Sequence, residues 1–473
     1  MPPSASPCAD RRASPAAGAP AVAVVGAGWS GLAAAVALAE AGLQVTLFES
    51  APQAGGRART IGLETPLGRI ALDNGQHLIV GAYRRTLALV ERLGAAPRLH
   101  RHPMHLASSS GLSLRAAPLP APLHLGWALL RARGLAWRER TALLRLMSGL
   151  RGAGWATLEA ETVDAMLARY RQPARLVERL WAPLCVGALN TLPTQACART
   201  FAAVLRDTLG AEADACDFIA PDAPLGALLP EPALDRLRRL GAAVRLRTTV
   251  RELRTSPSGW RVGDDGEAHA ALLLALPPWS AARLIEPLGL DVAALRAFEP
   301  EPIATAWAIW PADDAPRMPH WLMLDEDPVR RHFGQWSFDR GVIGAARVAG
   351  VVVSAASRIA DEAPEAVAEG IADQLQRAFG GPRAAAVRVV TERRATFRCT
   401  PRRPRLTCDH YAGRAPGLWL AGDWLWPDYP ATLEAAVRSG EQAAHAIVAH
   451  LGGRDGPQPA IGPRAQGQAA SSA

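Results

Sequence analysis

Lysine is missing from the sequence altogether, so all 52 of its basic side chains are arginine. Against 44 acidic residues they leave a net charge of +8, and they are spread along the chain without an arginine-rich block. Proteins that bind nucleic acid usually gather their basic residues into one patch. The sequence therefore disfavours a nucleic-acid partner and favours an anionic membrane surface or a phosphate-bearing cofactor.

Cysteines and long apolar runs are also scarce. No apolar run reaches the ~20 residues that a membrane-spanning helix needs. Residues 1–19 and 453–473 are rich in small and polar residues and are expected to be disordered. The cysteines form neither a CxxC pair nor a spacing typical of metal sites, which predicts mostly buried thiols in a reducing compartment and no metal centre; they are Cys8, Cys185, Cys197, Cys216, Cys399 and Cys408.

The rest of the chain is sufficient for large cores. Its 473 residues are 49% hydrophobic, which suits two or three domains of ~100–200 residues each. Arg11 and Arg12 precede an apolar run and so resemble an export signal, but cleavage there would destroy the glycine motif that follows. We therefore expect a cytoplasmic protein.

The glycine motif GAGWSG occupies residues 26–31, directly after the apolar run 21–25. Such a run is typical of a strand buried on both faces. A helix is expected over 32–41, and a second strand over 44–48 ends at Glu49. The order strand, glycine turn, helix, strand and acid predicts a dinucleotide-binding fold.

Each residue of this motif has a distinct role. Gly26 permits the tight turn, and Gly28 lets the backbone approach a pyrophosphate. Gly31 lets the helix lie close to the strand, and Glu49 would bond a ribose diol. The helix N-terminus presents free amides to the phosphates.

A second glycine pair, Gly55 and Gly56, follows the acid and is followed by Arg57. The loop can pack against the same pyrophosphate, and the arginine supplies planar, always-charged donors. This E-x(5)-GGR arrangement resembles the extended motif of FAD enzymes in the amine oxidase and phytoene desaturase superfamily. The resemblance implies FAD as the cofactor. It also implies an α/β fold, with a Rossmann-type, glutathione-reductase-like FAD-binding domain and an inserted α+β substrate domain.

A matching segment lies near the C-terminus. Residues 417–421 predict a strand, and Gly422 and Asp423 follow it. A helix is expected to begin at Pro430, because proline at a helix start removes an amide that would be unpaired anyway.

The first-turn amides at Ala431, Thr432 and Leu433 would then be free to donate. A helix N-terminus aimed at a flavin would stabilise the negative charge of its reduced form. In the resembled superfamily this segment is the second FAD contact, with Asp423 at the ribityl and phosphate end.

Mid-chain, a helix over 233–240 and a strand over 243–250 precede strands around Trp260 and over 271–276. In the resembled superfamily the chain re-enters the FAD domain here, with the backbone of Val250 beside the adenine. The implied division is a discontinuous FAD domain (20–95, 225–290 and 410–452) and a substrate domain (96–224 and 291–409).

The missing lysine also bears on the reaction. Amine oxidases of the superfamily use a lysine bonded through water to the flavin, together with an aromatic cage. A chain with no lysine and four tyrosines disfavours that chemistry. Desaturation of an isoprenoid, or reduction of an activated allylic carbon, remains.

Four stretches indicate one particular family within this superfamily. They are DNGQHLIVGAY (73–83), the segment 121–146, LWAPLCVGALNT (180–191) and AGDW with PATLEAAVRSGEQAA (421–444). Over residues 20–450 the chain resembles the hydroxysqualene dehydroxylases, squalene-associated FAD enzymes of hopanoid biosynthesis. The resemblance implies that reduced flavin delivers a hydride to hydroxysqualene, giving squalene and water. It also implies contact with squalene-pathway synthases. A phytoene-type desaturase and a non-catalytic flavin or lipid carrier remain alternatives.

Two residues are candidates for the acid that protonates the leaving oxygen, His77 and Asp73, which follow the GGR loop. Cleavage of the C–O bond needs this proton and shielding of the developing cation from water. His77 ranks first because histidine carries a proton near neutral pH. The alternative is structural, with Asp73 bonded to loop amides and His77 packed against the cofactor.

Residues 114–150 mix leucines and tryptophans with arginines, and Gly134 divides them into two short helices. Such a composition suits helices that lie on a membrane surface. Ordinary amphipathic helices of the substrate domain are an equal alternative. Likewise, four tryptophans either line the substrate cleft or fill the core, namely Trp307, Trp310, Trp321 and Trp336.

Overall fold

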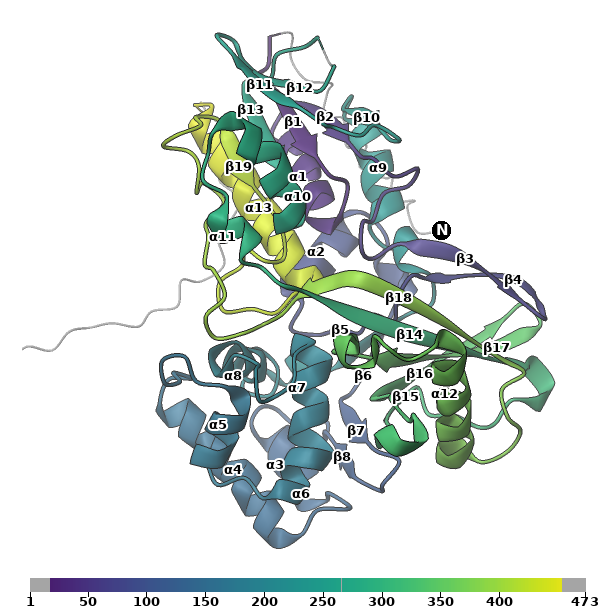
Figure 1. Ribbon diagram of the computed structural model, residues 1–473. Coiled ribbons are helices and arrows are strands. Elements are labelled where there is room, and N and C mark those ends of the chain that lie inside the picture. Colours follow the sequence, from purple (N-terminus) through teal and green to yellow (C-terminus); the bar gives the residue numbers. More distant parts are fainter. Residues whose placement is uncertain (1–17, 265, 453–473) are drawn as a thin grey trace, which may run out of the picture.

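The computed structural model describes residues 18–264 and 266–452 (Figure 1). The terminal segments for which the sequence predicts disorder lie outside these residues, apart from residues 18 and 19, and so does Cys8.

A five-stranded parallel sheet lies at one end of the molecule, with strand order β10-β2-β1-β13-β19 (Figure 1). This is the Rossmann-type α/β arrangement that the glycine motif predicts. Its strands are β1 (Ala21–Val25), β2 (Gln44–Phe48), β10 (Ala243–Arg245), β13 (Ala271–Leu274) and β19 (Leu418–Leu420).

Both faces of this sheet are covered by helices, which explains why its strands are apolar throughout. Val22 and Val24 pack in one core with α1 (Trp29–Glu40), α9 (Pro230–Arg239) and α13 (Leu433–His450). Ala23 and Val25 belong to a second core, which includes α10 (Pro278–Ile285). The α1 and α13 helices lie side by side (Figure 1), and a Cβ on Gly440 would lie 2.1 Å from the Ser30 carbonyl oxygen.

The second sheet is antiparallel, with strand order β15-β16-β17-β14-β18. Ala304 and Ala306 of its strand β14 (Pro300–Pro311) pack in one core with α12 (Pro364–Phe379), while Ile303 and Thr305 point to the opposite face. Its strands are β14 (Pro300–Pro311), β15 (Trp321–Met323), β16 (Trp336–Ile343), β17 (Ala346–Val353) and β18 (Ala386–Phe397).

Helices gather beside this sheet at the end of the molecule remote from the parallel sheet (Figure 1). They are α3 (Leu123–Leu130), α4 (Trp137–Gly152), α5 (Val163–Arg169), α6 (Ala174–Leu176), α7 (Ala182–Leu189) and α8 (Ala198–Asp207). The other α-helices of the described residues are α2 (Arg84–Arg92) and α11 (Ala293–Arg296).

Small antiparallel sheets complete the fold. The hairpins are β3 (Thr60–Thr65) with β4 (Gly68–Asp73), β7 (His105–Ala107) with β8 (Ser113–Arg115), and β11 (Leu253–Ser256) with β12 (Gly259–Val262). A three-stranded sheet joins β5 (Ile79–Val80), β9 (Phe218–Pro221) and β6 (Leu99–His102).

Strands from three separate stretches of sequence thus meet in the parallel sheet, which contains β1 and β2, then β10 and β13, then β19. The domain boundaries given above stay a prediction. Within the described residues, no helix combines the length and the apolar character needed to cross a membrane. Five cysteines of this part of the chain are buried free thiols, namely Cys185, Cys197, Cys216, Cys399 and Cys408.

Several expected elements differ in their ends, and the structure shows the cause of three of these differences. The first helix begins at Trp29 rather than residue 32, because Gly28 is its N-cap. The strand expected over 243–250 ends at Arg245, because Arg247 has a left-handed backbone (φ 56°) and its amide bonds to the Ala51 carbonyl. The last helix begins at Leu433 rather than Pro430, because the Thr432 side chain accepts from the Ala435 amide and caps it there.

Candidate active site

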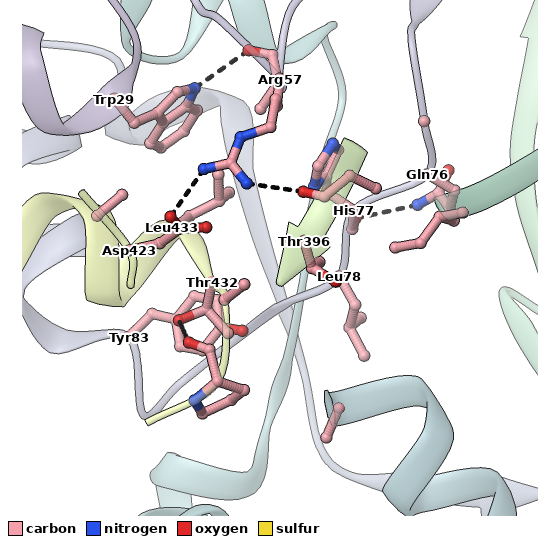
Figure 2. A pocket seen from close by; sticks show the side chains of 18 of the residues that line it. Trp29, Arg57, Gln76, His77, Leu78, Tyr83, Thr396, Asp423, Thr432 and Leu433 are labelled. Carbon is pink, nitrogen blue, oxygen red and sulfur yellow. Dashed lines mark hydrogen bonds and ion pairs between the residues drawn. The ribbon is translucent and has the colours of Figure 1, made fainter. Parts of the chain in front are cut away.

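A cavity of about 570 Å³ extends from the carboxyl ends of β1, β2, β13 and β19 to the antiparallel sheet. Cavities of this size are typical of sites for small molecules and cofactors. Most of the residues singled out for cofactor binding line it, namely Gly26, Gly28, Glu49, Gly55, Gly56, Arg57, Gly422, Asp423, Ala431, Thr432 and Leu433. Figure 2 shows the part of the cavity around Arg57 and Asp423.

The three glycines of the first motif are required for different reasons. Gly26 has φ +105°, and a Cβ there would lie 2.4 Å from the Ala275 carbonyl oxygen. A Cβ on Gly31 would lie 1.9 Å from the Gly26 carbonyl oxygen, so Gly31 lets helix and strand pack closely and does not itself line the cavity. A Cβ on Gly28 would contact nothing within 4 Å, so this residue leaves space on the cavity side.

Glu49 is held by the backbone around it. One carboxylate oxygen accepts from the Ala27 amide at 2.7 Å, and the other accepts from the Ala51 amide at 2.8 Å. The carboxylate therefore stays at the edge of the glycine turn, where it lines the cavity and keeps lone pairs for a hydroxyl donor such as a ribose.

The second glycine pair packs directly on the first motif. The Gly55 amide donates to the Ala27 carbonyl at 2.8 Å, and a Cβ on Gly56 would lie 3.1 Å from Cα of Gly28. Both residues have positive φ, +114° and +60°, which favours glycine. The two turns therefore form one wall, as the E-x(5)-GGR pattern predicts.

Arg57 joins this wall to the C-terminal segment. Its Nη2 donates to Oδ1 of Asp423 at 2.7 Å, and its Nη1 donates to the Ala395 carbonyl of β18 at 2.8 Å (Figure 2). Asp423 is buried, whereas the arginine side chain is 30% exposed. The guanidinium thus links the second glycine turn to the loop after β19 and to β18. It keeps donor capacity for an anionic ligand.

The start of α13 forms another part of the wall. Because Ala431 and Thr432 precede the first helical residue, their amides are not the first-turn donors that the sequence predicts; those are the amides of Leu433 and Glu434, which have no intrahelical partner. All three predicted residues nevertheless line the cavity. The positive end of the helix dipole is therefore directed toward it.

Glu434 fixes this helix end from behind. Its fully buried carboxylate accepts from the backbone amides of Arg85 (3.1 Å) and Thr86 (2.8 Å) at the start of α2. It also accepts from Nε of Arg438 at 2.6 Å. Tyr83, which precedes α2, lines the cavity beside Thr432 (Figure 2).

Asp73 does not line the cavity. It is buried at the end of β4, where it accepts from the Leu225 amide at 2.7 Å and lies 3.8 Å from Arg340. Burial raises its pKa to about 6, although the Leu225 amide and Arg340 both oppose the rise. Its contacts favour the structural alternative, because the amide that it accepts from belongs to the turn at Leu225–Ala227.

His77 does line the cavity, but its charge state differs from the expectation. Burial, together with the nearby cations Arg57 and Arg340, lowers its pKa to about 4. The imidazole is therefore neutral at pH 7, which removes the reason for ranking it first as a proton donor. The loop is held beside it by the Gln76 amide, which donates to Oγ1 of Thr305 at 3.3 Å.

The other end of the cavity is apolar. Trp336 and Phe338 of β16 contribute stacked rings 6.2 Å apart. Across from the sheet, α7 contributes small residues, and a Cβ on Gly187 would lie 3.0 Å from Nε1 of Trp336. The remaining apolar lining comes mainly from Met104, Leu106, Leu184, Ala188, Phe201, Val204, Leu205, Leu209, Phe218, Ile303 and Val352.

Other expectations have mixed outcomes. Of the four tryptophans, Trp336 lines the cavity, while Trp307, Trp310 and Trp321 are buried outside its lining. Val250 is half-buried and does not line the cavity, so its place beside an adenine stays a prediction.

Several lining residues were missed from the sequence. Phe201, Val204 and Leu205 of α8 lie on one helix face, and the C-cap Thr208 continues it. That periodicity is a detectable signal for an apolar face but not for what the face covers. Thr305, Glu392 and Thr396 are polar lining residues on strands, and no motif marks them.

Comparisons with known proteins identify the family of this chain. Residues 29–448 match the family of flavin containing amine oxidoreductases. The hydroxysqualene dehydroxylase of Sinorhizobium fredii is 31% identical over 439 residues, which cover 89% of this chain and 96% of that protein. The hydroxysqualene dehydroxylase of Rhodopseudomonas palustris is 31% identical over 445 residues, which cover 90% and 98%.

Among solved structures, cyclohexylamine oxidase from Brevibacterium oxydans superposes with a TM-score of 0.66 at 20% identity, covering 92% of this chain and 99% of that one. This likeness supports the fold. The chain is therefore a flavin-dependent oxidoreductase that belongs to the flavin containing amine oxidoreductases and, within them, to the hydroxysqualene dehydroxylase family.

Proposed function

We propose that this oxidoreductase uses FAD to remove the hydroxyl group of hydroxysqualene, giving squalene, in squalene and hopanoid biosynthesis. The observation that carries the proposal is one cavity with two chemistries: glycine turns, an acid and a helix N-terminus at one end, and an apolar chamber at the other. Relatives of matching length that are named hydroxysqualene dehydroxylase support the substrate.

The residues present fit a dinucleotide flavin. Gly28 leaves space for a pyrophosphate to approach the backbone, and Glu49 is held where it can bond a ribose. Arg57 and the free amides at the start of α13 would face the anionic parts of the cofactor. When bound in its reduced form, FAD supplies the hydride.

The chain's own task is to orient the substrate and exclude water. In the balanced reaction the C–O bond breaks, hydride forms the new C–H bond, and a proton joins the leaving hydroxyl to make water. The apolar chamber shields the carbon that becomes cationic. His77 stays a candidate for contact with the oxygen, but as a neutral imidazole it would donate a hydrogen bond rather than carry an extra proton.

Anaerobic incubation with hydroxysqualene tests the proposal. Protein whose flavin has been reduced with dithionite should form squalene, detected by mass spectrometry, with one flavin oxidised per product. The matched control is Gly28→Ala, which should lose the flavin and the product together. Product formation only with oxidised flavin, with loss of hydrogen from the substrate, would indicate a desaturase. Bound FAD without turnover in either redox state would indicate a carrier.

A further inference from the structure

Exposed apolar side chains are concentrated at the end of the molecule formed by α3 and α4. Among the described residues, seven of the nine large hydrophobic side chains that are exposed fall between residues 119 and 158. We define the docking patch as Leu123, Trp127 and Leu130 of α3 with Trp137 and Leu144 of α4, each 44–69% exposed. In Figure 1 these helices lie at the end remote from the parallel sheet.

Helix α3 has two apolar faces, and the protein buries only one of them. Ala128 and Leu129 are buried together with His124. Leu123, Trp127 and Leu130, spaced i, i+4 and i+7, form the other face and remain exposed. A short helix with an apolar face left in water is suited to insertion among lipid head groups and acyl chains.

The two helices are held together so that their exposed side chains form one surface. Arg140 of α4 donates to the carbonyls of Leu130 (2.6 Å) and Ala132 (2.7 Å) at the end of α3. Its guanidinium also lies over the Trp137 ring, 4.9 Å from the centroid. The exposed face of α3 is therefore anchored beside the first turn of α4.

The charge around the docking patch has one sign. Residues 116–158 contain six arginines and a single acid, Glu139. Glu139 is buried and bonded to the Ala136 amide at 2.7 Å and to Arg175 at 3.1 Å, so it does not offset the exposed arginines. Arg131 lies over the Trp127 ring at 5.0 Å, which places a cation at the edge of the apolar surface.

The docking patch is also connected to the wall of the cavity. The chain enters α3 from β8, where Leu114 pairs with Leu106 of β7. Leu106 lines the cavity, as does Met104, whose carbonyl accepts from the Ala116 amide at 2.9 Å. The segment that carries the patch therefore continues directly from strands that line the apolar end of the cavity.

We propose that the docking patch binds the surface of an anionic lipid bilayer. Leucines and tryptophans enter the interface while the arginines contact lipid phosphates. A second copy of the chain is a poor occupant, because it would bring the same arginines against each other. The idea that the bilayer supplies an insoluble substrate rests on the proposed function. Lipid binding itself can be tested without substrate.

The test is co-sedimentation of the purified full-length flavoprotein with vesicles of phosphatidylcholine, alone or mixed with phosphatidylglycerol. Wild type should bind the mixed vesicles, and added salt should weaken binding. The variant Leu123→Ser/Trp127→Ser/Leu130→Ser should lower the partition coefficient about tenfold or more. Replacing Arg133, Arg138 or Arg145 by glutamine should lower it about fivefold each. The control Val329→Ser/Val342→Ser changes exposed valines outside the patch and should bind as wild type.

Flavin absorbance and circular dichroism verify that each variant is folded. Equal vesicle binding by wild type and the α3 variant would overturn the proposal. So would an α3 variant that loses dimers in light scattering but still binds lipid, because the patch would then bind a second copy of the chain. Turnover of hydroxysqualene in detergent without vesicle binding would reject the docking patch alone. Vesicle binding without turnover would reject the proposed function alone.

Discussion

Nη2 of Arg57 lies 2.7 Å from Oδ1 of Asp423, although 366 positions separate the two residues in the chain. The pair brings the loop after β2 and the loop after β19 to the same point of the cavity wall. The ion pair therefore joins two distant parts of the sequence, and a cofactor that spans both loops would contact each of them.

Breaking this pair should lower both the free energy of unfolding and the amount of bound flavin. Arg57→Gln leaves the buried Asp423 carboxylate without its charge partner, so the free energy of unfolding should fall by about 1–3 kcal/mol. The ratio of flavin to protein absorbance should fall with it. The control Arg254→Gln removes an arginine from the exposed pair with Glu252 and should change stability by less than about 0.5 kcal/mol. An unchanged flavin content in Arg57→Gln would contradict the proposal that Arg57 contacts the cofactor.

Alanine at two glycines of one motif should affect different properties, the stability of the fold at Gly31 and the affinity for flavin at Gly28. Gly31→Ala should destabilise the fold by about 3 kcal/mol, because its Cβ would overlap the Gly26 carbonyl oxygen. Gly28→Ala should leave folding unchanged, because its Cβ contacts nothing and its backbone (φ −72°, ψ 176°) suits alanine. It should instead weaken flavin binding about tenfold or more, if the pyrophosphate approaches there. Chemical denaturation and flavin titration separate the two effects, and tight flavin binding by Gly28→Ala would refute this placement.

Asp73 should make the protein less stable as the pH rises. Its folded pKa of about 6 exceeds the ordinary 3.8, so the folded state holds the proton more tightly and loses that advantage between pH 4 and pH 6. The rise corresponds to roughly 3 kcal/mol. The free energy of unfolding of Asp73→Asn relative to wild type should therefore increase over this range. The exposed Asp235→Asn is the control, and parallel pH curves for Asp73→Asn and wild type would contradict the buried acid.

His77 should stay neutral over most of the working pH range. Its folded pKa of about 4 lies below the ordinary 6.5, so the stability it contributes is complete above pH 6.5 and is lost as the pH falls toward 4. The NMR signal that disappears in His77→Gln should show a neutral ring at pH 6. His100→Gln, which changes an exposed ring, identifies a second signal for comparison. A His77 signal that titrates near pH 6.5 would restore it as a proton donor.

Local patterns in the sequence were enough to predict the glycine turns that line one end of the cavity. Residues 21–49 form the strand, glycine turn, helix and strand in the expected order, because buried apolar runs and glycine turns act through backbone sterics and local burial. Element ends were less predictable. The helix expected at Pro430 begins at Leu433, since a side-chain hydrogen bond from Thr432, not the proline, sets its first turn.

The chain's own sequence, read alone, therefore determined the Rossmann-type motif and the composition of its glycine turns. Tertiary structure decided which way Asp73 points, the neutral state of His77 and the lining from α7, α8 and β16. The difference is physical. A turn depends on a few adjacent residues, whereas burial, pKa values and pairings such as Arg57 with Asp423 depend on which distant segments pack together.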